Sequence, residues 1–264
     1  MAELLLKNLE PLFTAPAPLV LNANGTSPIV LVCEHASHFI PPELDGLGLS
    51  NEAMDGHWAW DPGAMAVAEA MSARLDAPLV ASQVSRLVYD CNRPPNASGA
   101  MVTRGEGFEI PGNAALNHDQ RQARIDLVYE PFRAALAGVV ATKAGAPVLV
   151  TIHSFTPVYY GKIRKVQLGI LHDDDARFAD AILQEAHYFT SLDVKRNQPY
   201  AASDGVTHTL REHAINAGLL NVMLEIRNDL IATEGTQQAI AAMVSDLVLS
   251  ALSSLGVDDA RDKS

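Results

Sequence analysis

Two histidines in this sequence follow apolar runs at the point where each run ends. His35 comes just after the run 28–33. His153 comes directly after the run 147–152. Short continuous apolar runs are typical of strands buried on both faces of a sheet, and ligands of open α/β sheets bind beyond the carboxyl ends of such strands. The sheet would therefore bring both histidines to one edge, where two histidines and a carboxylate form a common catalytic zinc set with one position left for water. A histidine at a strand end can also be a hydrogen-bonded structural residue.

The third ligand of such a set is not defined by spacing. Asp61 precedes a proline and an alanine-rich helical segment, so a helix N-cap is its plainest interpretation, although a capping carboxylate can also face a metal at the sheet edge. His38 forms a His-x-x-His spacing with His35, but these residues follow a strand, where the same-face rule of helices does not apply. Glu34 would point away from His35 if the strand continued. The residues alone leave Asp61, Glu34 and His38 open as the third ligand.

Glu225 is a carboxylate inside the otherwise apolar run 219–226. Burying such a group is costly unless it has a partner or faces a solvated cleft. An ion pair with Arg227 is one explanation, because alternation along a strand puts both side chains on the same face. The other explanation is that Glu225 is the general base of the metal site.

A group of polar residues follows the second apolar run, 78–81, in the segment 85–95. It contains Arg86, Asp90, Asn92 and Arg93. The planar guanidinium of arginine can bind a carboxylate through two parallel hydrogen bonds, so this segment is a candidate for recognition of a substrate carboxylate. A structural ion pair between Asp90 and one arginine is an equally good explanation.

Apolar runs that alternate with helical patterns predict an α/β fold, a three-layer sandwich whose mainly parallel or mixed central sheet carries helices on both faces. The predicted strands are 28–33, 78–81, 147–152, 166–171 and 219–226. The predicted helices are 51–75, 119–143, 174–187 and 237–255. A long loop, rich in proline, glycine and asparagine, is expected over 92–117. The 264 residues are expected to form one domain, with a core over about 28–256 and a disordered tail over 258–264.

The composition excludes several classes of function. A net charge of −12 disfavours binding to nucleic acids and to anionic membranes. No run of about 18 apolar residues indicates a membrane span. The N-terminus has acidic residues where a secretory signal would be basic, and two cysteines make no disulfide framework. These features favour a cytoplasmic protein with free thiols, and they leave its oligomeric state open.

Several of these motifs, in this order along the chain, resemble the N-formylglutamate amidohydrolase family. The similar segments are Val-Cys-Glu-His-Ala-Ser over 32–37, Ile-Pro-Pro-Glu over 40–43, Trp-Asp over 60–61, Ser-Arg-Leu-Val-Tyr-Asp-Cys-Asn-Arg over 85–93 and Ile-His-Ser-Phe over 152–155. The resemblance extends from about residue 28 to residue 230. Better-known members carry Pro-His-Ser-Gly where this chain has Glu-His-Ala-Ser over 34–37, which indicates a divergent branch.

The resemblance implies a fold similar to that of zinc carboxypeptidases and zinc-dependent cell-wall amidases, and a hydrolase that cuts a linear amide bond. It implies one zinc ion per chain and a small N-acylated acidic amino acid, such as N-formylglutamate, as substrate. The implied site residues are the metal ligands His35, Asp61 and His153, the base Glu225, and the substrate contacts Arg86, Asn92, Arg93 and Arg227. A peptidase or cell-wall-type amidase on the same scaffold, and a metal- or ligand-binding module without turnover, are the alternatives.

Overall fold

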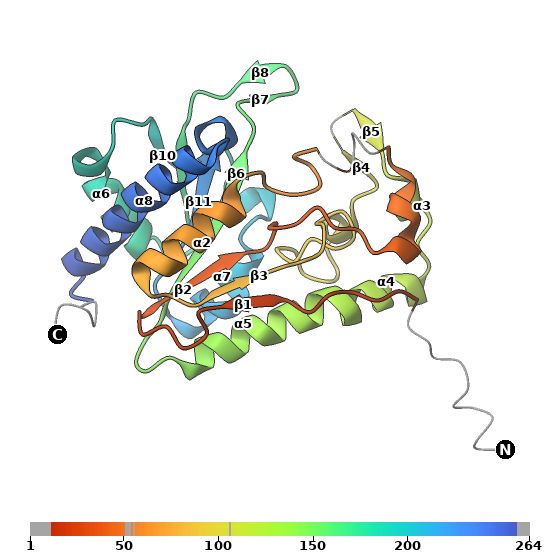
Figure 1. Cartoon of the computed structure of the whole chain (residues 1–264), viewed down its shortest axis with the longest axis horizontal. Helices are drawn as coiled ribbons and strands as arrows, with labels where there is room; N and C mark the ends of the chain where they lie inside the picture. Colours follow the sequence, from red (N-terminus) through yellow and green to blue (C-terminus); the bar gives the residue numbers. More distant parts are fainter. Residues whose placement is uncertain (1–11, 51–53, 55, 106, 258–264) are drawn as a thin grey trace.

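A seven-stranded mixed sheet forms the centre of the computed structural model, which describes residues 12–50, 54, 56–105 and 107–257 (Figure 1). In spatial order the strands are β1 (Leu19–Leu21), β3 (Leu79–Ala81), β2 (Ile29–Cys33), β6 (Val148–Phe155), β11 (Asn221–Arg227), β9 (Leu168–Leu171) and β10 (Val194–Arg196). The pairs β1–β3 and β11–β9 are antiparallel, and the other neighbours are parallel. The carboxyl ends of β2, β6 and β11 therefore meet at one edge.

Helices cover both faces of this sheet, as the sequence predicts. On one face lie α2 (Ala64–Leu75), α6 (Arg177–Phe189) and α8 (Glu234–Ser254), which share an apolar layer with alternate residues of β2 such as Ile29 and Leu31. On the other face lie α5 (Glu130–Thr142) and α7 (His208–His213), which share a second apolar layer with the intervening Val30 and Val32. The alternation of side chains along each strand thus gives two apolar layers and a three-layer sandwich.

All five predicted strands are present, each with ends shifted by no more than three residues. The sequence analysis missed β1 and β10, and it missed two hairpins, β4 (Arg104–Gly105) with β5 (Phe108–Glu109) and β7 (Val158–Tyr159) with β8 (Lys162–Ile163). These strands have two or three residues, which is too short for an alternating pattern to be recognised. The remaining short elements are η1 (Pro42–Gly48), η2 (Ser98–Met101), α3 (Pro111–Ala114), α4 (His118–Arg124), η3 (Ile125–Tyr129), η4 (Ala202–Asp204), η5 (Ile215–Ala217) and η6 (Asn228–Ile231).

The predicted helix over 51–75 is wrong over 56–63, which form turns and irregular backbone, and α2 starts at Ala64. Residues 51–53 and 55 of this prediction lie outside the described residues. Gly63 takes the N-cap position with a φ of 82°, a left-handed conformation that glycine adopts without a steric cost. Asp61 lies in the turn before it and is not the N-cap. Its side chain is therefore free of the capping role and can face the sheet edge.

Buried Arg124 fixes the long loop that the sequence predicts over 92–117. Its guanidinium donates hydrogen bonds to the Asn113 side-chain oxygen at 2.6 Å and to the Val88 carbonyl at 3.1 Å. Asn113 in turn donates to the carbonyls of Leu87 and Val102 at 2.8 and 2.7 Å. Burial lowers the pKa of Arg124 to about 10, still well above neutrality. This charged anchor holds the polar segment 85–93 in place beside the sheet edge.

The predictions for the two ends of the chain, the absence of a secretory signal and the disordered tail over 258–264, fall on 1–11 and 258–264, outside the described residues. Among the helices that are described, none is both long and apolar enough to span a membrane.

Candidate metal centre and active site

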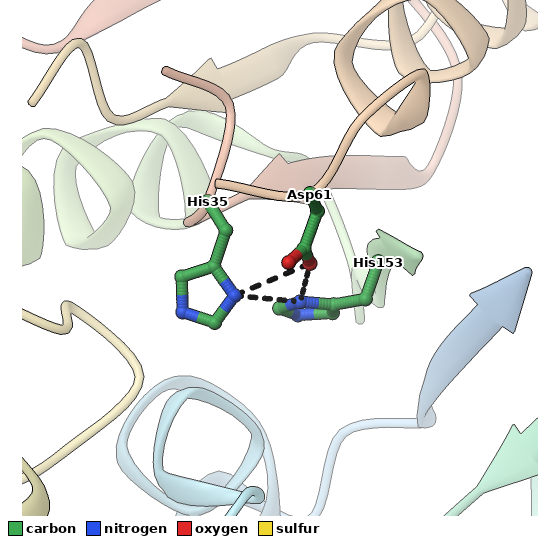
Figure 2. A group of neighbouring side chains, drawn as sticks. All are labelled: His35, Asp61 and His153. Carbon is green, nitrogen blue, oxygen red and sulfur yellow. Dashed lines mark hydrogen bonds and ion pairs between the residues drawn. The ribbon is translucent and has the colours of Figure 1, made fainter. Parts of the chain in front are cut away.

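His35, Asp61 and His153 converge at the carboxyl edge of the sheet, and we call these three residues the ligand cluster (Figure 2). Asp61 Oδ2 lies 3.2 Å from His35 Nδ1 and 2.9 Å from His153 Nδ1. The two Nδ1 atoms are 3.2 Å apart. All three side chains are buried, with 2–3% of each residue exposed. One oxygen and two ring nitrogens therefore point at a common centre.

Backbone contacts between distant segments fix this arrangement. His35 lies two residues beyond β2, and its carbonyl accepts a hydrogen bond from Asp61 N at 2.9 Å. The next residue after His153, Ser154, donates its backbone N–H to Asp61 Oδ2 at 3.3 Å. The turn before α2 is thus tied to both β2 and β6, which brings Asp61 between the two histidines.

A carboxylate lies against the far nitrogen of each histidine ring. His35 Nε2 is 2.7 Å from Asp90 Oδ1, and His153 Nε2 is 3.1 Å from Glu34 Oε2, an ion-pair contact without hydrogen-bond alignment. Burial alone would raise the pKa of Asp90 and Glu34, but the adjacent histidines lower it below the ordinary value, together with Arg86 at Asp90. An ionised carboxylate only accepts, so it draws the ring proton to Nε2 and leaves a lone pair on Nδ1. Both lone pairs then point into the ligand cluster.

This donor set fits a divalent metal ion. Two ring nitrogens 3.2 Å apart beside a carboxylate oxygen require a proton or a metal ion among them, because their lone pairs would otherwise repel one another. Three buried carboxylates, those of Glu34, Asp61 and Asp90, contact the two histidines, and Arg86 forms ion pairs with only two of them, Asp61 and Asp90. Burial lowers the pKa of both histidines and the carboxylates raise it, with a net rise, so the site attracts positive charge. Histidine nitrogen and carboxylate oxygen are typical zinc ligands.

Arg86 connects two of these carboxylates. Its guanidinium lies 3.3 Å from Asp61 Oδ1 and 3.1 Å from Asp90 Oδ2. Burial alone would raise the pKa of Asp61, but His35, His153 and Arg86 together hold it well below its usual range. Asp61 is therefore a permanent anion, and the hypothesis of an ion pair between Asp90 and an arginine is confirmed for Arg86.

Glu225 lies beside the ligand cluster. It is the register partner of His153 on the neighbouring parallel strand, so both side chains project from the same face of the sheet. Burial raises the pKa of Glu225 to about 7. Within the described residues its Oε2 has no hydrogen-bond partner, and Arg227 binds Asp229 instead, at 2.8 and 3.1 Å. The structure therefore does not contain the ion pair between Glu225 and Arg227 that was the alternative.

The ligand cluster and Glu225 line a pocket of about 610 Å³, a size suited to a small molecule. Arg93 and Asn92 also line it. Arg93 donates to the carbonyls of Gly205 and Asn92, and within the described chain it has no carboxylate partner. Asn92 uses both ends of its amide on backbone, donating to Val206 O at 2.5 Å and accepting from Thr209 N at 3.0 Å.

The structure does not bring every predicted residue to the pocket. Arg227 is not among the residues that line it. Of the two other candidates for the third ligand, His38 packs edge-on against Trp60, and Glu34 contacts the outer nitrogen of His153. The sequence analysis missed the contacts of Glu34 and Asp90 with the histidines, although both residues stand beside residues it selected.

Two further pocket residues, Arg164 and Tyr200, were also missed. Arg164 directly follows β8, and Tyr200 lies in an irregular segment after β10. The nearby sequence feature is the Tyr-Gly pair at 160–161, which precedes Arg164. In the structure these two residues have positive φ values of 46° and 74° and form a tight hairpin turn.

The sequence matches the family model described as N-formylglutamate amidohydrolase over residues 27–232. No curated protein matches the chain.

Two solved structures are similar to this chain. A crystal structure of a gene product from Agrobacterium tumefaciens is 51% identical, covers 91% of this chain and 96% of its own, and superposes with a TM-score of 0.89. A crystal structure of N-formylglutamate amidohydrolase from Ralstonia eutropha is 21% identical, covers 90% of this chain and 96% of its own, and gives a TM-score of 0.67. The second likeness shows the shared fold.

Proposed function

The chain belongs to the N-formylglutamate amidohydrolase family, hydrolases that act on an amide bond, and from this premise we propose that it is a zinc-dependent enzyme. It removes the formyl group, or another small acyl group, from an N-acylated acidic amino acid such as N-formylglutamate. The observation that carries this proposal is the convergence of two histidine nitrogens and one carboxylate oxygen beside a buried glutamate with a raised pKa.

In this proposal His35, Asp61 and His153 hold one zinc ion per chain. When bound, zinc polarises a scissile carbonyl and lowers the pKa of water. Asp90 contacts Nε2 of His35, and Glu34 contacts Nε2 of His153. These contacts fix the direction of each ring and increase the basicity of the nitrogen that would bind the metal. Arg86 forms ion pairs with both Asp61 and Asp90 and so fixes the two carboxylates relative to each other. Its proposed role is therefore to position the metal site, not to contact the substrate.

Glu225 is the proposed general base. Its carboxylate accepts a proton as the water oxygen attacks the acyl carbon, and it then passes this proton to the nitrogen of the leaving amine. The C–N bond breaks as the new C–O bond is kept, so a formyl substrate gives formate and the free amino acid. A pKa of about 7 suits both halves of this cycle, because the group can be deprotonated before attack and can release the proton afterwards.

Arg93 is the proposed contact for a substrate carboxylate. It lines the pocket, is half-buried and donates hydrogen bonds to neutral carbonyls, and it forms no ion pair with a carboxylate of the described residues. Asn92 forms hydrogen bonds with the backbone of Val206 and Thr209 and so fixes the adjacent side of the pocket. Arg227 contacts Asp229 and lies outside the pocket lining, so it has no direct part in substrate binding in this proposal.

Metal analysis of the purified protein, followed by product assays on a panel of acyl amino acids, tests the proposal. We expect about one zinc per chain, loss of activity with a chelator, and release of formate from N-formylglutamate or N-formylaspartate. The panel includes N-acetyl analogues, a dipeptide and a cell-wall muropeptide. Turnover of only the dipeptide or muropeptide would replace the proposal with a peptidase or amidase, and bound zinc without turnover of any member would favour a binding module.

A further inference from the structure

Arg164 is a cation in the pocket that the proposed function has not used. It follows the hairpin β7–β8, and its backbone N–H donates to Pro157 O at 2.8 Å, which closes the base of the hairpin. Its guanidinium carbon lies 4.3 Å from the ring centre of Tyr159, 4.9 Å from that of Tyr200 and 5.6 Å from that of Phe155. Three aromatic rings thus fix the direction of a half-buried charged group.

The hydrogen-bonding capacity of this guanidinium is not filled. Nη1 of Arg164 is buried and has no hydrogen-bond partner in the part of the chain that the structure describes. Arg164 also forms no ion pair there. Arg86, by comparison, is held between two carboxylates in the same pocket. A buried guanidinium N–H without an acceptor is costly, and an anionic oxygen of a ligand would satisfy it.

Tyr200 connects Arg164 to the reacting end of the pocket. Burial raises the pKa of the Tyr200 hydroxyl, the charge of Glu225 raises it further, and the charge of Arg164 lowers it. Tyr200 therefore lies within electrostatic reach of both residues. Arg164, Tyr200 and Glu225 line the same pocket, so an anion bound at Arg164 would share that pocket with the proposed base.

The backbone of Arg164 is held by Arg227, which the sequence predicts as a substrate contact. Arg227 donates to the Arg164 carbonyl at 3.2 Å and to the Lys165 carbonyl at 3.3 Å, while Asp229 fixes the Arg227 side chain. Arg227 acts through Arg164 and is a positioning residue. Such support holds a recognition group in one geometry, which favours selectivity.

We propose that Arg164 is a specificity-determining residue that binds one carboxylate of a dicarboxylic substrate, while Arg93 binds the other. This inference rests on the proposed function for the identity of the reaction, but not for the anion site itself. Two arginines on separate segments, the loop after β3 and the hairpin β7–β8, then select N-acyl amino acids with an acidic side chain over those with a neutral one. A guanidinium recognises a carboxylate by two parallel hydrogen bonds, which a carboxamide cannot accept in the same way.

The test compares acid and amide forms of one substrate in matched variants. N-formylglutamate, N-formylglutamine and the α-amide of N-formylglutamate are assayed with wild type, Arg164→Gln, Arg164→Lys and Arg93→Gln. Lys162→Gln, an exposed change on the same hairpin, is the matched control for loss of one positive charge. We expect Arg164→Gln to reduce the preference for acid over amide at one of the two carboxylates by about 10- to 100-fold, the scale of a charged hydrogen bond. Arg93→Gln should reduce the preference at the other carboxylate, and Arg164→Lys should recover part of the loss.

An equal fall of kcat/KM on acid and amide substrates in Arg164→Gln would overturn the proposal, since that pattern indicates a structural role. Calorimetric titration with glutarate, and with butyrate as the monocarboxylate, provides a readout that does not need turnover. If wild type hydrolyses no acyl amino acid but binds glutarate in a manner that Arg164→Gln abolishes, the anion site stands and the proposed reaction fails. If wild type is active and Arg164→Gln binds glutarate as wild type does, the reaction stands and the anion site fails.

Discussion

The ligand cluster and the arginine-bearing wall of the pocket, which consists of Arg93 and Arg164, are built in different ways. The ligand cluster projects from the ends of parallel strands and from a turn tied to them, and its polar atoms contact one another or a second layer of carboxylates. The wall arginines come from a loop and a hairpin, are half-buried, and contact neutral carbonyls or aromatic faces.

This difference separates two tasks. A metal site and a base need fixed distances, and buried strands provide them. Recognition of a substrate tolerates longer loops, provided that each guanidinium keeps its direction. Changes in the ligand cluster should therefore act on metal content and kcat, and changes in the wall should act on KM and on the choice of substrate.

The largest expected effect is that of His153→Ala. Loss of one nitrogen from the proposed zinc set should remove most of the metal and abolish activity, because three protein ligands hold a catalytic zinc. The fold should persist, since the site lies at the edge of the sheet rather than in the apolar layers. Metal analysis and circular dichroism on the same sample measure both; full zinc content in folded mutant protein would show that His153 is not a ligand.

Glu225→Gln should come next, because it removes the base and keeps the shape. We expect kcat to fall by about 10²-fold or more, the usual scale for loss of a general base, with zinc content and folding near normal. Steady-state kinetics with metal analysis make the measurement. Wild-type kcat in a variant with full zinc would contradict the mechanism, whereas a loss of stability with kcat preserved would assign Glu225 a structural role.

Asp90→Asn tests the second layer of the ligand cluster. An asparagine can no longer hold the Nε2 proton of His35 as strongly, so metal affinity should fall by about 10- to 100-fold. Competition with a chelator of known affinity measures this change. Asp246→Asn removes the same charge from an exposed ion pair with Arg74 and is the matched control; an equal effect in both variants would mean that only net charge matters.

A smaller effect is expected in the wall. Arg93→Lys keeps the charge but loses the planar pair of donors, so KM for the acidic substrate should rise by about 10-fold with zinc content unchanged. Assays on the substrate and its carboxamides make the comparison. Arg104→Lys, an exposed arginine outside the pocket lining, should change nothing. Equal wild-type activity on the acid and both amides would exclude a carboxylate contact in the wall altogether.

The sequence predicts the ligand cluster better than the wall for a physical reason. His153 and Glu225 lie on long apolar strands, and His35 lies two residues beyond the end of another. The rule that parallel strands share a carboxyl edge places all three together. Asp61 depends on a turn that returns to the His35 carbonyl, so spacing alone gave it a capping role and only the family resemblance selected it.

In the wall, local sequence contains little information about which arginine faces the pocket. Arg164 owes its direction to aromatic rings from three separate segments. Arg227 is turned away by Asp229 and by carbonyls some sixty residues earlier in the chain. The amide of Asn92 is filled by backbone more than a hundred residues later. Apart from Phe155, Tyr159 and Asp229, these partners are distant in the sequence, so an arginine or asparagine that binds substrate and one that binds backbone look the same in the sequence.

The pH dependence of activity gives the smallest effect and the sharpest separation of the two regions. Burial raises the pKa of Glu225 to about 7, and a base acts only when deprotonated, so kcat/KM should rise as the pH increases toward 7 and then level off. A bound divalent cation favours the carboxylate form, so the midpoint of the metal-loaded enzyme should lie at or below this value. The wall arginines take no part in the proposed proton transfer. Substitutions of Arg93 or Arg164 should therefore lower the profile without moving its midpoint, whereas Glu225→Gln should remove the rise.

Profiles of kcat/KM from about pH 5 to 9 on one substrate measure this dependence. A midpoint that moves by a full pH unit in Arg93→Lys would show that the wall and the base are coupled, and the division between the two regions would fail.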